Sequence, residues 1–349
     1  MADSTQLFAA AAGYFGRPDP SGLVGVFRRA TDGDGWQHVL KEHETYTVSV
    51  SPGDPNVVFA GTADGVYRSI DRGKSFTRTK FPDTGTQIWS ILHDPADPKL
   101  MLAGASPVAV YRSEDGGESW KRMPDPGMPD RAKMPFACRV MRFAASTRRA
   151  GEVFAALEVN GVMRSTDGGE SWSDCSDDLI RLAEKPHLRS KIVSDTTNEG
   201  MLDGHAICTT AADPDSVILA VRMGLFRSSD EGRHWEDLEV GRFSPVTYGR
   251  DIRVSPQDPR TLYAALSVAA SSKDGALYRS TDVGRTWQRF DKVQVHGTVM
   301  SVALHQQDAK QVWLAARYGE VFGTQDSGAT WQAAPLPAGV KDIYALACG

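Results

Sequence analysis

The stretch YRSEDGGESW spans residues 111–120, and MRSTDGGESW spans residues 163–172. Both follow the pattern S-x-D-x-G-x-x-W, called the repeat motif below. Two near-identical decapeptides in one chain indicate an internal repeat, and the period of a repeat constrains the fold more strongly than any single segment. Further copies are YRSIDRGKSF (67–76), FRSSDEGRHW (226–235), YRSTDVGRTW (278–287) and FGTQDSGATW (322–331), and FRRATDGDGW (27–36) keeps only the glycine and the tryptophan in register.

The aromatic residue that closes each copy gives the period. Successive closing residues lie 40 to 63 positions apart. A period of about 40–50 residues with β-rich sequence between the motifs is typical of a β-propeller, in which each repeat forms one blade. The closing residues are Trp36, Phe76, Trp120, Trp172, Trp235, Trp287 and Trp331.

The residue types of the motif suit a tight turn. An Asp carboxylate accepts backbone N–H groups within a turn, and Gly adopts a positive φ at little cost. The closing aromatic residue offers a large face to bury. We therefore interpret the motif aspartates as structural and not catalytic; they are Asp71, Asp115, Asp167, Asp230, Asp282 and Asp326.

Each repeat also has an upstream half whose sequence recurs from one repeat to the next. VSVSPGDPNVVFAGT (48–62) and IRVSPQDPRTLYAAL (252–266) each contain two β-rich runs joined by a turn with Asp-Pro, a dipeptide that favours turns. Two further strands flank the motif, so each repeat predicts four antiparallel strands. TQLFAAAAG (5–13) and KDIYALAC (341–348) complete one blade from both ends of the chain. The prediction is an all-β, seven-bladed β-propeller that forms a single domain over residues 1–349, closed by terminal strands that share blade 1.

The motif resembles the BNR or Asp-box repeat, which occurs in sialidases, xyloglucanases, sortilin-type receptors and a seven-bladed photosystem II assembly factor. The resemblance covers almost the whole chain and implies the propeller fold. Sialidases of this type carry an early Arg-Ile-Pro motif that this sequence lacks. Because one fold hosts many chemistries, the resemblance leaves both an enzyme and a binding scaffold open.

Composition narrows the class of protein. The chain has 349 residues and a net charge of −5, so no basic excess points to nucleic acid. No apolar run reaches the length of a membrane-spanning helix, and the start lacks a basic, apolar leader. The four cysteines lack CxxC spacing and fit reduced thiols. We expect a cytoplasmic protein without nucleic-acid or membrane partners, and the oligomeric state stays open.

Candidate functional residues gather where the inner strands begin, at one end of the central channel, called the mouth. Arginine suits carboxylate recognition because its planar fork binds two oxygens. The alternative is that the arginines form structural ion pairs with Glu44, Glu158, Asp203, Asp251 and Asp342. The expected channel ring is Tyr46, Trp89, Arg139, His205, Arg250, Met300 and Asp342, with Arg222 and Arg317 at the ends of second strands.

His205 is the first catalytic candidate at the mouth, since a neutral imidazole acts as a general base near neutral pH. Asp203 or Glu44 would orient it, and Tyr248 would serve as an acid. The alternative is a hydrogen-bonded channel histidine. His205, His296 and His43 form a weaker candidate set for a divalent metal, and we expect no other cofactor.

Two insertions interrupt the repeat. Residues 173–204 include SDDLIRLAEK, which predicts a helix that caps the channel mouth, and residues 121–137 form a second insertion on the same face. Long insertions in compact domains are often functional. The alternative is that both insertions only cover blade edges.

Three functional hypotheses follow. The first is a hydrolase or lyase that acts on a small anionic, carboxylate-bearing molecule or saccharide, with Arg139, Arg222, Arg250, Arg317, Trp89 and Tyr46 binding it. The second is a non-catalytic propeller scaffold that binds an acidic peptide or protein partner. The third is a glycosidase that uses two carboxylates among Glu44, Glu158, Asp203 and Asp342.

Overall fold

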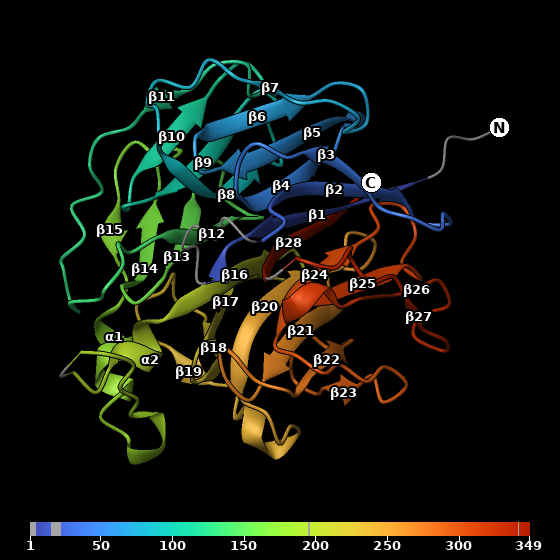
Figure 1. The fold of residues 1–349 in the computed structure, drawn as a ribbon. Helices are drawn as coiled ribbons and strands as arrows, with labels where there is room; N and C mark the ends of the chain where they lie inside the picture. The colour runs from blue at the N-terminus through green and yellow to red at the C-terminus, as the bar shows by residue number, and fades with distance from the viewer. Residues whose placement is uncertain (1–4, 15–21, 195, 341) are drawn as a thin grey trace.

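The computed structural model describes residues 5–14, 22–194, 196–340 and 342–349. Their strands form seven sheets, each of four antiparallel strands. Figure 1 shows the sheets arranged as blades around a central axis, so the predicted all-β, seven-bladed propeller is confirmed. No helix in these ranges is long and apolar enough to cross a membrane.

The strands of each blade run from the channel outward. Blade 1 has β28 (Asp342–Cys348), β1 (Gln6–Ala12), β2 (Gly25–Ala30) and β3 (Gln37–Leu40); blade 2 has β4 (Thr45–Ser51), β5 (Asp54–Thr62), β6 (Gly65–Ser69) and β7 (Thr77–Arg78); blade 3 has β8 (Gln87–His93), β9 (Met101–Ser106), β10 (Val110–Ser113) and β11 (Lys121–Arg122). Blade 4 has β12 (Val140–Ala145), β13 (Val153–Leu157), β14 (Gly161–Ser165) and β15 (Ser173–Asp174); blade 5 has β16 (Gly204–Thr210), β17 (Asp213–Val221), β18 (Gly224–Ser228) and β19 (Glu236–Asp237). Blade 6 has β20 (Tyr248–Val254), β21 (Leu262–Ser267), β22 (Gly275–Ser280) and β23 (Gln288–Arg289); blade 7 has β24 (Val299–Leu304), β25 (Val312–Ala316), β26 (Val321–Thr324) and β27 (Gln332–Ala333).

The two ends of the chain meet in blade 1. β28 pairs with β1 in antiparallel register from Leu7 and Cys348 to Ala12 and Asp342. In Figure 1 the red C-terminal strand lies beside the blue N-terminal strand. This pairing is the predicted closure, and it removes the open edges that the first and last blades would otherwise expose.

The repeat motif forms a turn held by its serine and aspartate. Ser113 donates from Oγ to Asp115 Oδ1 at 2.8 Å, and the backbone N–H groups of Glu118 and Ser119 donate to the same oxygen at 3.0 and 2.9 Å. Burial opposes ionisation of Asp115, but these hydrogen bonds outweigh it and lower the pKa to about 2. The motif carboxylate is therefore occupied by the turn, in agreement with its structural interpretation.

Neighbouring blades pack closely because small residues line the second strands. Gly104 lies on β9 of blade 3, and an ideal Cβ there would be 2.6 Å from the Cβ of Val140 on β12 of blade 4. Ser90 on β8 donates from Oγ to the Val140 carbonyl at 2.7 Å across the same boundary. The apolar core is thus divided into clusters between adjacent blades.

The first insertion contains α1 (Asp177–Leu182), η2 (Pro186–Leu188) and α2 (Glu199–Leu202). Leu179, Leu182 and Leu202 are buried in the cluster between blades 4 and 5. Asp178 accepts the backbone N–H of Trp235 at 2.7 Å. Figure 1 places both α-helices at the rim beside these blades. The insertion therefore covers a blade boundary, and a capping role over the mouth stays a prediction.

The second insertion, residues 121–137, likewise covers a blade boundary, the one between blades 3 and 4. Met123 and Met128 pack against the apolar cluster of those blades. Phe136, near its end, lies 5.0 Å from the Arg139 guanidinium, measured from its ring centroid. Two short 3-10 segments, η3 (Val240–Arg242) and η4 (Arg317–Gly319), complete the described elements.

Candidate functional site

All seven inner strands share a break in register near the mouth. In each, one residue is skipped in the pairing with the second strand. Such a β-bulge re-aims the side chain that it carries. Five of the skipped side chains pack together with Ala12, although they come from different blades, which places them in the channel. The skipped residues are Tyr46, Trp89, Met141, His205, Arg250, Met300 and Tyr344.

The observed ring corrects the expected one in two blades. Met141 takes the place expected for Arg139, and Tyr344 takes the place expected for Asp342. The expectation used the Asp-Pro turn after each inner strand as a ruler. β12 is followed by STRRAGE, and β28 pairs with β1 from the other end of the sequence, so the Asp-Pro ruler could not be applied to either strand.

Aromatic residues fill one side of the channel. Tyr46 stacks on Trp89 with ring centroids 4.2 Å apart, and Tyr344 meets Trp89 edge-on at 5.3 Å. Glu44 accepts the Tyr46 hydroxyl at 2.9 Å and the Gly13 N–H at 3.1 Å. Glu44 therefore ties blade 2 to blade 1, and its described hydrogen bonds do not involve His205.

His205 forms a buried polar cluster on the opposite side. Its Nδ1 donates to the Gly249 carbonyl at 2.7 Å. The Tyr248 hydroxyl oxygen lies 3.1 Å from Nε2, and Asp203 Oδ2 lies 3.3 Å from the same nitrogen. The structure thus brings together three of the predicted catalytic residues, each no more than 5% exposed.

The environment shifts the two acidic partners of this histidine in opposite directions. Burial raises the pKa of Tyr248. Burial also opposes ionisation of Asp203, but His205, Arg222 and Arg250 outweigh it and lower the pKa of that carboxyl. Tyr248 therefore holds its proton more firmly than a free tyrosine, whereas Asp203 favours its ionised form.

Two predicted binding arginines are paired within the protein. Arg139 contacts Glu158 at 2.9 Å, and its guanidinium lies 4.0 Å from the Trp89 ring centroid. Arg317 pairs with Asp342 and donates from Nε to the Ala270 carbonyl at 2.6 Å. Each of these two arginines therefore has a carboxyl group of the protein as a partner.

Arg250 differs from them. It is 8% exposed, and its side chain makes no hydrogen bond or ion pair with the described residues. It acts electrostatically on Glu158, Asp203, Tyr248 and Tyr344. Its positive charge is therefore shared among several groups and not neutralised by one, which suits an external anion.

Glu158 belongs to this cluster, although the sequence suggested only an ion partner or one of several carboxylates. It lies just beyond β13, and its side chain is 13% exposed. Burial raises the pKa of Glu158, with Arg139 opposing and Asp203 adding to the shift. The adjacent carboxyls Glu158 and Asp203 thus differ in their tendency to ionise. The available signal was its place beyond the second strand, opposite the start of β12.

Arg222, His43 and His296 are the remaining candidate residues from the sequence. Arg222 is half-buried, 5.8 Å from the Tyr248 ring centroid. His43 bonds to the Tyr67 hydroxyl at 2.7 Å, and His296 contacts Glu320 at 3.1 Å. The three histidines considered for a metal thus have separate partners. Over residues 5–14, 22–194, 196–340 and 342–349 no group of three His, Cys, Asp or Glu is arranged to hold a metal ion.

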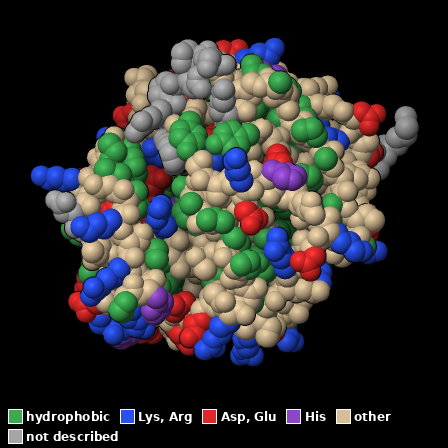
Figure 2. Space-filling model, turned by 60° about the horizontal axis from the view of Figure 1, so that its bottom comes forward, with side chains coloured by type: hydrophobic (Ala, Val, Ile, Leu, Met, Phe, Trp, Pro, Cys, Tyr) green, Lys and Arg blue, Asp and Glu red, His purple; other side chains and the backbone are tan. Residues whose placement is uncertain are grey.

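Charged side chains are mixed over the surface. Figure 2 shows acidic and basic groups interspersed around one face, with hydrophobic side chains between them. This distribution fits the modest net charge of −5.

No family model matches the chain. A xyloglucanase from Paenibacillus sp is 25% identical over 221 residues, which are 52% of this chain and 20% of that protein. A probable oligoxyloglucan-reducing end-specific xyloglucanase from Neosartorya fischeri is 28% identical over 248 residues, 65% of this chain and 27% of that protein. The matches thus cover only a fifth to about a quarter of these curated relatives.

Solved structures resemble the chain in fold. A GH74 enzyme from Niastella koreensis has a TM-score of 0.63 at 14% identity, covering 96% of this chain and 47% of that one. YCF48 from Cyanidioschyzon merolae has a TM-score of 0.57 at 17% identity, covering 88% and 90%. YCF48 bound to D1 peptide has a TM-score of 0.52 at 14% identity, covering 83% and 80%. At these identities the likeness shows the propeller fold alone.

Proposed function

We propose that the chain is a glycosidase-like hydrolase or lyase that acts on a carboxylate-bearing saccharide at the channel mouth. The observation that carries the proposal is Arg250, a buried guanidinium without a hydrogen bond or ion pair among the described residues, beside Glu158 and Asp203. A buried charge is costly without a counter-charge. The carboxylate of a sugar acid would supply that charge through paired N–H···O bonds.

The two carboxyls provide the acid and the base that glycoside hydrolysis requires. A carboxyl with a raised pKa keeps its proton for the leaving oxygen, and an ionised one activates water or attacks the sugar. Burial raises the pKa of Glu158, whereas His205 and the nearby arginines lower that of Asp203. We assign Glu158 as the acid and Asp203 as the base or nucleophile.

Elimination is a second reaction that the Arg250 guanidinium would support. Arg250 would neutralise the substrate carboxylate and acidify the adjacent C–H. A base removes that proton, the bond to the leaving oxygen breaks, and a carbon–carbon double bond forms. The Tyr248–His205 hydrogen bond of 3.1 Å provides a donor and an acceptor for these proton transfers.

A turnover assay tests the enzyme proposal and separates the two chemistries. The chain is incubated with oligosaccharides that end in a sugar acid and with neutral xyloglucan fragments. Hydrolysis is followed by new reducing ends, and elimination by the ultraviolet absorbance of an unsaturated product. We expect turnover of the acidic substrates, and a loss of about 100-fold or more in Glu158→Gln and Asp203→Asn if hydrolysis is the reaction.

The matched control is Glu118→Gln. Like Glu158→Gln, it replaces a carboxyl group by an amide, but in a side chain that is 62% exposed. It should leave turnover unchanged. Glu158→Gln and Asp203→Asn retaining wild-type hydrolysis would contradict the acid and base assignments. No turnover of any acidic oligosaccharide would contradict the enzyme proposal.

A non-catalytic scaffold for an acidic peptide is the second candidate. The observation that favours it is the share of each solved structure that the chain covers. The chain matches most of the length of YCF48, including the form bound to D1 peptide, but less than half of the GH74 enzyme. Burial of His205 and Tyr248 also fits binding without chemistry. This candidate predicts salt-sensitive binding of an acidic peptide with no turnover.

A cytoplasmic location remains part of the proposal. Its support is that Cys138, Cys175, Cys208 and Cys348 are all free thiols. The absence of nucleic-acid and membrane partners likewise rests on the charge balance of the sequence.

A further inference from the structure

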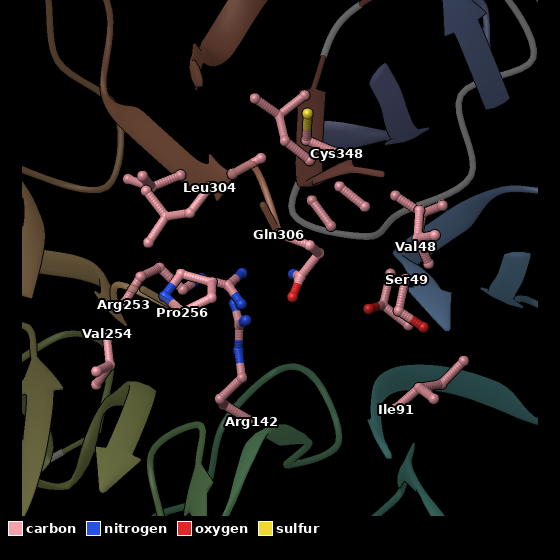
Figure 3. Close-up of a pocket in the computed structure, with 17 residues that line it drawn as sticks. Val48, Ser49, Ile91, Arg142, Arg253, Val254, Pro256, Leu304, Gln306 and Cys348 are labelled. Atoms are coloured by element: carbon pink, nitrogen blue, oxygen red, sulfur yellow. The ribbon is translucent and has the colours of Figure 1, made fainter. Parts of the chain in front are cut away.

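A second charged cavity lies at the far end of the channel, away from the mouth cluster. Its volume is about 190 Å³, and residues of β4, β8, β12, β20, β24 and β28 line it. Figure 3 shows Arg142, Arg253 and Gln306 reaching toward its middle from different blades, with Ser49 on the other side. The hypotheses drawn from the sequence concerned only the mouth and did not include these residues.

The charge in this cavity is not balanced. Arg142 and Arg253 are the two charged residues among those that line it. Both contact one carboxylate, Asp251, at 3.4 and 3.1 Å. Asp251 is fully buried, and it also accepts the Val302 N–H at 2.9 Å. Two cations therefore share one anion, which leaves about one positive charge facing the cavity.

The two guanidinium groups also have donors to spare. In the described part of the chain each makes one hydrogen bond, through a single nitrogen, to Asp251. An arginine carries five N–H donors. The side chains of Arg142 and Arg253 are 23% and 30% exposed, so the remaining donors can meet a ligand. Burial, and next the charge of Arg253, lower the pKa of Arg142 to about 10, as expected for cations crowded together.

We propose that this cavity binds a small oxyanion, a phosphate or a short carboxylate, between Arg142 and Arg253. Guanidinium groups from two blades would each bind its oxygens through charge-assisted hydrogen bonds. Ser49 and Gln306 add polar groups to the wall. The volume is below the roughly 300 Å³ at which sites for larger organic ligands begin, so the ligand is small. The proposal does not depend on any activity at the mouth.

Calorimetric titration of the full chain tests the proposal, with inorganic phosphate and with malonate as separate probes. Ionic strength is held constant with chloride so that general screening does not change. Binding of either probe is expected, and the stronger one identifies the oxyanion class. Arg253→Gln should weaken binding by about tenfold or more, because one charge-assisted contact is lost.

Gln306→Glu is the second variant, chosen because Gln306 is exposed and makes no contact with Asp251 among the described residues. A carboxylate at this position would neutralise the cavity without disturbing the buried pairs, and it should abolish phosphate binding. Arg148→Gln is the control: Arg148 is 54% exposed and pairs with Asp215 outside the cavity. It should bind as wild type does.

Three results would overturn the proposal. The first is that wild type binds neither probe. The second is that Gln306→Glu binds with wild-type affinity. The third is that Arg148→Gln loses as much affinity as Arg253→Gln does. Glu158→Gln should leave phosphate or malonate binding unchanged, so a failed enzyme assay and a failed anion site would be distinguishable.

Discussion

Asp115 shows how one side chain organises a turn of this protein. Its carboxylate accepts two backbone N–H groups and two serine hydroxyls, from Ser113 and Ser119. Equivalent aspartates occur in five other blades with the pKa lowered to about 2. At the mouth Asp203 is also ionised, but its partners are His205 and arginines. The partners of each aspartate, more than its residue type, separate turn residues from site residues.

A stability measurement tests the role of Asp115. The folded pKa of about 2 lies below the ordinary 3.8, so the carboxylate stabilises the fold above about pH 4 and this contribution is lost as pH falls through 2. Asp115→Asn should lower the free energy of unfolding by about 0.5–1 kcal/mol near neutral pH, since exposure to solvent weakens these bonds. Urea unfolding should show a smaller difference near pH 2.

The control for this experiment is Glu114→Gln, because the Glu114 side chain is 73% exposed and forms a surface ion pair with Arg112. It should change stability little at either pH. A deficit in Asp115→Asn that is the same at both pH values would contradict the charge-based explanation.

The inner strands are the elements that convert the fold into a site. The bulge near the start of each one aims a residue into the channel, so His205 and Arg250 reach the same space from neighbouring blades. Arg142 and Arg253 follow farther along the inner strands, Arg142 directly after Met141 on β12 and Arg253 near the end of β20. One set of strands thus builds both ends of the channel, while the close approach of blades at positions such as Gly104 holds the strands in place.

Gly104→Val tests that close approach. A Cβ at this position would overlap Val140 of the next blade, so the blades must separate locally. We expect a loss of about 1–3 kcal/mol in the free energy of unfolding, as for other overpacked cores. Gly53→Val is the matched control, because no described residue lies within 4 Å of a Cβ there. Equal stability of the two variants in urea unfolding would contradict the packing argument.

At the scale of the whole molecule, the repeat motif and its spacing were enough to predict the fold. Seven motifs, four strands for each, and complementary terminal strands were sufficient to predict a closed ring. The site was less predictable. The ring alignment failed at Met141 and Tyr344, where the Asp-Pro ruler could not be applied to the inner strand.

Side-chain pairing across blades was beyond the sequence pattern. Arg139 and Arg250 both lie near the start of an inner strand, yet among the described residues only Arg139 has a carboxyl group, that of Glu158, at 2.9 Å. That difference depends on how side chains orient across the channel, and a one-dimensional pattern does not contain it. The shared carboxylate of Arg142 and Arg253 was missed for the same reason.

The central claim is that Arg250 holds a carboxylate, and calorimetric titration with glucuronate and with glucose tests it most directly. Wild type and the surface control Arg148→Gln are predicted to bind glucuronate and not glucose. Arg250→Gln should bind glucuronate about tenfold or more weakly, because the charge-assisted pair is lost. Equal affinity for the sugar acid and the neutral sugar, or wild-type affinity in Arg250→Gln, would contradict the claim.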